Sequence, residues 1–97
     1  MMTLHTLNAS PASAAFADCL RLLAPGDALL LLGDGVYAAL EGTAARQALD
    51  ASPAQLYILQ PDAAAAGVLG RIGTLELVDI DGFVALSERF ARQLAWY

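Results

Sequence analysis

The chain has 97 residues, of which 58% are apolar and only 15% are charged, and its mean hydropathy is +0.54. Five arginines, no lysine and ten carboxylates give a net charge of −5, which argues against direct binding to nucleic acid or to an anionic membrane. The length predicts a single domain over residues 1–97. A composition this apolar in a domain this small predicts a surface that contacts another protein chain.

The sequence also carries signals about the compartment. Its apolar runs are all shorter than the roughly 20 residues of a membrane span, and its start lacks the basic region and apolar core of a signal peptide. A single cysteine excludes an internal disulfide and fits a reducing compartment. We therefore expect a cytoplasmic protein.

The first segments of the chain alternate between strand and helix patterns. Residues 2–7 form an apolar, β-branched run that is typical of a strand. Ser10 followed by Pro11 predicts the N-cap and first position of a helix that continues to about residue 23. One stripe of this helix is apolar and consists of Phe16, Cys19, Leu20 and Leu23.

The next apolar run, residues 28–32, lies between a turn at 24–27 and two glycines that flank Asp34. It predicts a strand buried on both faces of a parallel sheet. The segments that follow are expected to be a helix at 36–40, a helix that Thr43 caps and that continues to 49, a strand at 55–59, an alanine-rich helix from Pro61 that Gly67 ends, a strand at 74–78 and a helix at 83–90.

This alternation predicts an α/β fold: a flavodoxin-like three-layer α/β/α sandwich around a mainly parallel sheet of four or five strands. The tail, residues 91–97, is too short to bury its own apolar side chains. It is expected to pack against a partner or along the edge of the sheet, with a short C-terminal strand as one possibility.

Ligands of such folds bind at the carboxyl ends of the strands. In this chain three of the four loops there carry aspartates, and none of the four carries a cation. The aspartates are Asp34, Asp62, Asp79 and Asp81. Aspartates can bind Mg²⁺, but at strand-to-helix junctions they commonly cap helices, and we prefer the capping interpretation. Since the glycine-rich phosphate-binding motifs are also missing, we expect no cofactor and no metal.

Two further side chains could carry chemistry. Cys19 is either a nucleophile that holds a persulfide or a small buried residue of the apolar stripe. Its position well past the helix N-terminus favours the second alternative, because the helix dipole lowers the thiol pKa only near that end. His5, alone in the first strand, is more typical of a hydrogen-bonded structural residue than of a catalytic base. The candidates for contact with a partner chain are Tyr37, Leu94, Trp96 and Tyr97.

Three segments together resemble the TusB/DsrH family, within the DsrE/DsrF/DsrH-like superfamily. They are the run Met-Thr-Leu-His-Thr-Leu-Asn-Ala-Ser-Pro at 2–11, the run Asp-Gly-Val-Tyr-Ala-Ala at 34–39, and the run Asp-Ile-Asp-Gly-Phe-Val-Ala-Leu at 79–86 followed by Gln-Leu-Ala-Trp at 93–96. The resemblance spans the whole chain in the order that the family shows.

The resemblance implies a subunit of a TusBCD-type complex, in which TusC-like and TusD-like subunits complete a dimer of heterotrimers. Such a complex is a sulfurtransferase relay that takes sulfur from a TusA-like carrier and passes it through a TusE-like carrier, toward 2-thiolation of the tRNA wobble uridine. The transferring cysteine of that complex lies in the TusD-like subunit, which implies a structural rather than a catalytic role here.

The resemblance also keeps an alternative open. DsrH-type members belong to a sulfur-oxidation complex and carry a cysteine on the first helix, where this chain has Cys19. A DsrH-type subunit with Cys19 as a persulfide carrier is therefore the second hypothesis, and it brings the two interpretations of this thiol close to even.

Overall fold

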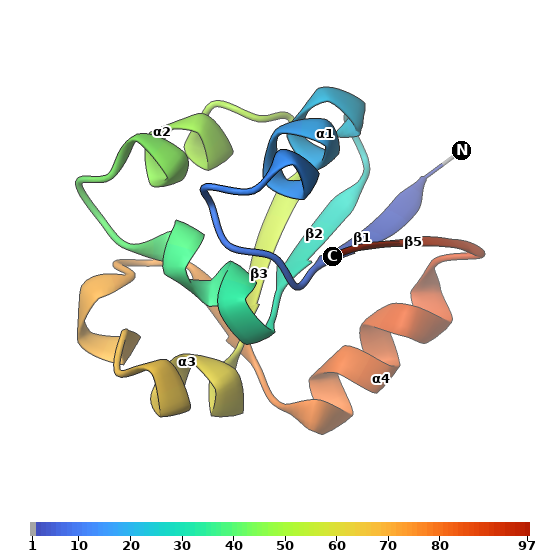
Figure 1. The fold of residues 1–97 in the computed structure, drawn as a ribbon. Helices are drawn as coiled ribbons and strands as arrows, with labels where there is room; N and C mark the ends of the chain where they lie inside the picture. The colour runs from blue at the N-terminus through green and yellow to red at the C-terminus, as the bar shows by residue number, and fades with distance from the viewer. Residues whose placement is uncertain (1) are drawn as a thin grey trace.

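The computed structural model describes residues 2–97 and contains a five-stranded parallel sheet with the strand order β4-β3-β2-β1-β5 (Figure 1). The strands are β1 (Thr3–Leu7), β2 (Ala28–Leu31), β3 (Gln55–Leu59), β4 (Glu76–Val78) and β5 (Arg92–Trp96). The helices are α1 (Ala14–Leu22), α2 (Ala44–Asp50), α3 (Gln60–Ala66) and α4 (Ile80–Arg89), and two short 3₁₀ helices are η1 (Gly33–Ala39) and η2 (Leu69–Arg71). The expected α/β sandwich is confirmed.

The distribution of helices over the two faces follows from the strand order. The first three crossovers each move the chain by one strand in the same direction, and the last returns it from β4 past three strands to β5. Because such crossovers are right-handed, the first three place their helices on one face and the last places its helix on the other. Side chains of α1, α2 and α3 accordingly share one apolar cluster, while α4 packs into a second. One helix thus covers the second face.

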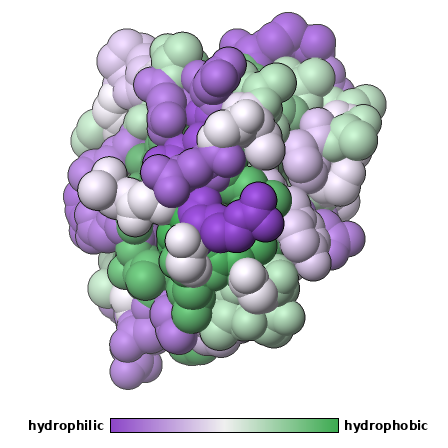
Figure 2. Space-filling view, turned by 90° about the vertical axis from the view of Figure 1, so that its left-hand side faces the viewer, coloured by the Kyte–Doolittle hydropathy of each residue, from purple (hydrophilic) through white to green (hydrophobic). Residues whose placement is uncertain are grey.

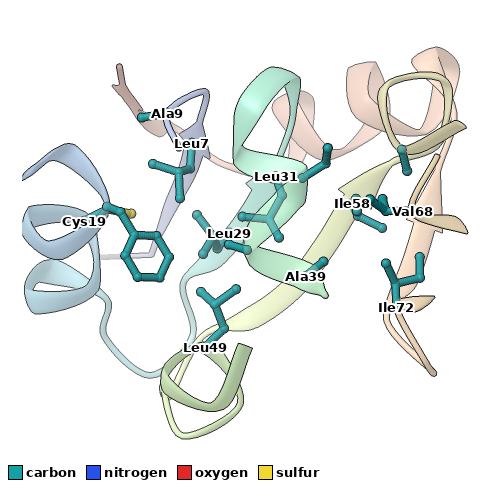
Figure 3. Close-up of a cluster of buried hydrophobic side chains, with 14 of the residues drawn as sticks. Leu7, Ala9, Cys19, Leu29, Leu31, Ala39, Leu49, Ile58, Val68 and Ile72 are labelled. Carbon is teal, nitrogen blue, oxygen red and sulfur yellow. The ribbon is translucent and has the colours of Figure 1, made fainter. Parts of the chain in front are cut away.

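The middle strand β2 supplies both apolar clusters. Leu29 and Leu31 lie in the cluster on the face that α1, α2 and α3 cover, and Figure 3 shows both within it. Leu30 points the other way, into the cluster that holds the buried side chains of α4. All four residues of β2 are buried, as the uninterrupted apolar run predicts.

Three helix starts differ from the expectation. The N-cap of α1 is Ser13, whose Oγ accepts from the N–H of Phe16 at 3.3 Å, so the prediction of a cap at Ser10 is wrong. Ser10 lies in the preceding turn, where its carbonyl accepts from the Ser13 hydroxyl at 2.7 Å. With two serines three residues apart, either could cap the helix, and the second does. The chain after β2 forms η1 directly from Gly33, and α4 begins at residue 80 rather than 83.

The other local signals hold. Thr43 caps α2 by accepting from the N–H of Arg46 at 3.2 Å. Gly67 ends α3 with a φ of 75°, in the left-handed region that favours glycine. The tail forms β5 and pairs with β1 along the sheet edge, which was one of its two expected positions.

A substitution at Gly35 tests whether the fold requires η1 to approach β1 this closely. A Cβ at this position would collide with the backbone carbonyl of Leu7, which cannot move without disturbing β1. We expect Gly35→Ala to lower the free energy of unfolding by about 1–3 kcal/mol, the usual cost of overpacking. Denaturant unfolding measures this. Gly70→Ala is the matched control, because its Cβ would meet nothing within 4 Å, and an equal loss in both variants would contradict the explanation.

Candidate functional site

The carboxyl edge of the sheet forms a shallow cavity of about 240 Å³. Its lining consists of Gly33, Asp34, Tyr37, Asp62, Ala65 and Ala66. Asp79 accepts from the N–H of Gly82 at 2.7 Å and is the N-cap of α4, as the capping interpretation predicts. Asp62 is not an N-cap, because it lies in the first turn of α3. Its carboxylate accepts from the N–H of Gly33 at 2.7 Å and so connects α3 to the start of η1.

The other two aspartates of this edge, Asp34 and Asp81, are exposed. Within residues 2–97, no three side chains of His, Cys, Asp or Glu are grouped so that they could hold a metal ion. The edge thus offers a few fixed carboxylates and a small open hollow.

A second group of polar residues lies at the opposite, amino-terminal edge. Asp27, 4% exposed, precedes β2 and accepts from the backbone N–H of Thr3 at 2.9 Å and of Ala24 at 3.1 Å. Its other contact is the His5 Nε2 atom at 3.0 Å. The far side of the His5 ring contacts Trp96, whose Nε1 lies 3.1 Å from Nδ1. One buried carboxylate therefore connects β2, β1 and β5.

The protonation of His5 follows from these partners. An indole nitrogen can only donate a hydrogen bond, so the Nδ1 atom that receives it from Trp96 carries no proton. The proton of the neutral ring then lies on Nε2 and is donated to Asp27. The two rings also stack, with centroids 6.3 Å apart and an interplanar angle of 19°. His5 is 1% exposed and uses both ring nitrogens, as expected for a structural histidine.

The ionisation of Asp27 depends on a balance of two effects. Burial alone would raise the pKa of its carboxyl group. The N–H donors of Thr3, His5 and Ala24 stabilise the carboxylate more than burial destabilises it, and the pKa lies below its usual value. The network therefore contains an ionised carboxylate at neutral pH.

A cavity of about 220 Å³ adjoins this network, between the end of α1 and β5. It is lined by Thr3, His5, Leu22, Ala24, Asp27, Arg92 and Leu94. The His5 and Asp27 atoms here are already paired with each other and with the backbone. The cavity thus exposes a mainly apolar rim with one arginine.

Cys19 lies on the buried face of α1 against the sheet, and Figure 3 shows it within the cluster of buried hydrophobic side chains. Burial raises the pKa of its thiol from 9.0 to about 12. At neutral pH the sulfur is therefore a protonated thiol, which is a poor nucleophile. In this conformation it is also out of reach of a sulfur donor.

The four candidates for partner contact occupy different environments. Tyr97 is 82% exposed and the ring of Tyr37 lines the hollow at the carboxyl edge. Leu94 and Trp96 are half-buried on β5, and the indole N–H of Trp96 is used inside the chain. Figure 2, which views the side of α2 and α3, shows that apolar residues also reach the surface there between polar ones. Contact with a partner chain stays a prediction for all four residues.

Two structurally central residues were not singled out from the sequence. The sequence indicated Asp27 only as the last residue of the predicted turn at 24–27. Arg46 is buried at 8% exposure, and its guanidinium donates to the carbonyl of Ile72 at 2.8 Å and to Asp50 at 3.1 Å. It also donates to the carbonyl of Ala39, so it joins η1 and α2 to the segment after η2. The only local sign of this role in the sequence was that Arg46 lies three residues after the Thr43 cap.

Among residues 2–97, the helices are all too short or too polar to cross a membrane. The comparison with protein families matches the model of DsrH-like proteins over residues 9–93. The chain therefore belongs to the DsrH-like family, and the resemblance seen in the three sequence segments is confirmed.

Its curated relatives include protein TusB from Escherichia coli K12, which is 44% identical over 94 residues, or 96% of this chain and 99% of that protein. Protein TusB from Erwinia tasmaniensis is 45% identical over the same share of both chains. Among solved structures, protein Tm0979 from Thermotoga maritima has the same fold, with a TM-score of 0.69, 23% identity, and coverage of 91% of this chain and 93% of that one.

Asp27 provides a test of the buried network. The ionised Asp27 side chain stabilises the folded state. This contribution is complete above about pH 3.9, the pKa of an unfolded aspartate, and is lost as the pH falls through the lower pKa of the folded state. We expect Asp27→Asn to lower the free energy of unfolding at pH 7 by about 1–3 kcal/mol, since it removes a charged acceptor from three buried donors. The stability of the variant should also depend less on pH below 4. Denaturant titrations at several pH values measure both effects.

Asp18→Asn is the matched control for this prediction. Asp18 forms an exposed pair with Arg21 on α1, and exposed pairs contribute about 0–1 kcal/mol. If Asp27→Asn is as stable as the control at pH 7, the carboxylate does not hold the strands together.

Proposed function

We propose that this chain is a non-catalytic subunit of a TusBCD-type sulfur-relay complex in the cytoplasm. The observation that carries the proposal is the near-full-length similarity to curated TusB proteins. In this role the chain assembles with TusC-like and TusD-like subunits as a dimer of heterotrimers. The complex receives sulfur from a TusA-like carrier, passes it to a TusE-like carrier and supports 2-thiolation of the tRNA wobble uridine. The chain itself makes no contact with nucleic acid or membrane.

The outer surface of α4 supports an assembly role. Ile80 and Val84 lie one turn apart on this helix, and they are 54% and 50% exposed. Since α4 alone covers its face of the sheet, apolar side chains on its outer side have no further layer of this chain above them. Exposed apolar residues grouped in this way are typical of a surface that another chain covers.

The chemistry of the side chains supports a non-catalytic role. The thiol of Cys19 is buried and protonated at neutral pH. His5 uses both ring nitrogens within the chain. The groups most suited to nucleophilic or acid–base chemistry are therefore committed to packing and hydrogen bonding, and the sulfur-carrying cysteine of the complex is assigned to the TusD-like subunit.

Co-purification tests the assembly. The chain, coexpressed with its TusC-like and TusD-like subunits, should elute with both of them in one complex. Val84→Asp should weaken this association at least about tenfold, because it places a charge in an apolar contact. Ala48→Asp is the control, since it adds the same charge at an exposed position of α2. A chain that elutes alone when coexpressed with both subunits would contradict the proposed function.

The sequence also suggested Cys19 as a persulfide carrier of a DsrH-type complex. We do not favour this alternative, because the thiol is buried and its pKa is raised to about 12. The three-unit rise corresponds to roughly a thousandfold less thiolate at neutral pH than for an exposed thiol.

Chemical labelling distinguishes the two roles of Cys19. We expect iodoacetamide to modify Cys19 at pH 8 at least about a hundredfold more slowly in the folded chain than in denaturant. A persulfide donor should likewise leave the folded chain without the mass of an added sulfur atom. The variant Ala17→Cys/Cys19→Ser, with its thiol on the exposed side of α1, is the positive control for both reagents. Rapid sulfur transfer to Cys19 in the folded chain would support the carrier hypothesis instead.

A further inference from the structure

The two edges of the sheet are protected to different degrees. A free edge carries unpaired backbone groups, and proteins usually shield it with short strands, charges, proline or bulges. The β4 edge follows this rule, because the strand has three residues and begins with the exposed Glu76. The β5 edge has five residues, and its one charge, Arg92, stands at the start. From Gln93 onward β5 has neither charge nor proline.

The backbone groups that β5 leaves unpaired can be identified. Its neighbour is β1, and the carbonyl of Trp96 accepts from the N–H of Asn8 at 2.8 Å. In a parallel ladder, alternate residues direct both their N–H and C=O groups to the same side. The N–H and C=O groups of Leu94 and Trp96 therefore point toward β1, while those of Gln93 and Ala95 point away from the sheet.

This outward row is self-complementary. We propose that β5 pairs antiparallel with β5 of a second copy of this chain, about a two-fold axis at Ala95. Ala95 then bonds to Ala95 of the second copy, and Gln93 lies opposite Tyr97. Both N–H and C=O groups of each outward residue find a partner, and the two sheets join into one. The inference goes beyond the proposed function and does not depend on it.

The side chains of β5 fit the same arrangement. The register that pairs Ala95 with itself places Leu94 opposite Trp96 of the second copy, and both are half-buried apolar residues on the α1 side. Cross-strand pairs of aromatic and aliphatic side chains stabilise a sheet. Leu94 also lines the 220 Å³ cavity beside the exposed Leu22, so the incoming Trp96 lies next to an apolar rim.

The charges on β5 do not oppose a second copy at this edge. Each chain has a net charge of −5, but β5 itself contains no carboxylate. Its single charge, Arg92, would lie opposite a position beyond Tyr97 and outside the paired stretch. Like charges therefore do not face each other across the proposed junction.

Hydrogen exchange of the unmodified chain tests the pairing directly. In a monomer the inward amides of Leu94 and Trp96 are protected, whereas the outward amide of Ala95 exchanges freely. We expect protection of the Ala95 amide to rise roughly tenfold or more with protein concentration, in step with a doubling of the mass seen by light scattering. The variant Ala95→Pro should remain monomeric, because it removes an outward donor and leaves the β1 ladder intact.

Ala95→Val is the matched control, because it keeps the N–H and favours a strand, and it should still dimerise. Circular dichroism verifies that both variants are folded. A monomeric mass with a freely exchanging Ala95 amide at every concentration would overturn the proposal. So would protection of Ala95 that arises only when TusC-like and TusD-like subunits are added, which would assign the edge to a heterologous strand while leaving the proposed function intact.

Discussion

One buried carboxylate links the C-terminal strand to the middle of the sheet. Asp27, at the start of β2, binds the backbone of β1 at Thr3 and the ring of His5, and that ring accepts the indole N–H of Trp96 on β5. The hydrogen bonds that lower the pKa of Asp27 keep it ionised, and an ionised acceptor fixes the proton of His5 on Nε2. The free Nδ1 can then accept only from a donor such as Trp96. Three neighbouring strands are thus held in register by polar contacts as well as by apolar packing.

This arrangement limits what the chain can do chemically. An imidazole with both nitrogens occupied has no free site for a substrate proton, and the carboxylates of Asp62 and Asp79 each accept from a backbone N–H. Cys19 fills space under the sheet as a protonated thiol. What remains available is surface, which includes the exposed Ile80 and Val84 of α4 and the free edge of β5. A structural role in a larger assembly requires contact surfaces, and it requires neither a free nucleophile nor a free acid–base group.

Local signals in the sequence predicted much of the fold, because capping, turn formation and strand burial depend on neighbouring residues. The apolar run of β2, the Thr43 cap and the Gly67 terminus were all predicted on this basis. The Ser10 cap was not, because Ser13 offers the same chemistry three residues later. The network around Asp27 was beyond prediction for a different reason. Asp27 contacts His5, which is 22 residues away on β1, and His5 contacts Trp96, which is 91 residues away from it on β5. Both contacts depend on a strand order that local patterns do not encode.

The last crossover explains why the chain has two unpartnered surfaces. The return from β4 to β5 reverses the direction of the first three crossovers, so a right-handed connection must place α4 alone on its face. The same step delivers β5 to the free edge beside β1. The outer side of α4 and the edge of β5 therefore arise from one topological event and lie on different sides of the molecule. A chain built in this way has one candidate contact surface made of helix side chains and another made of strand backbone.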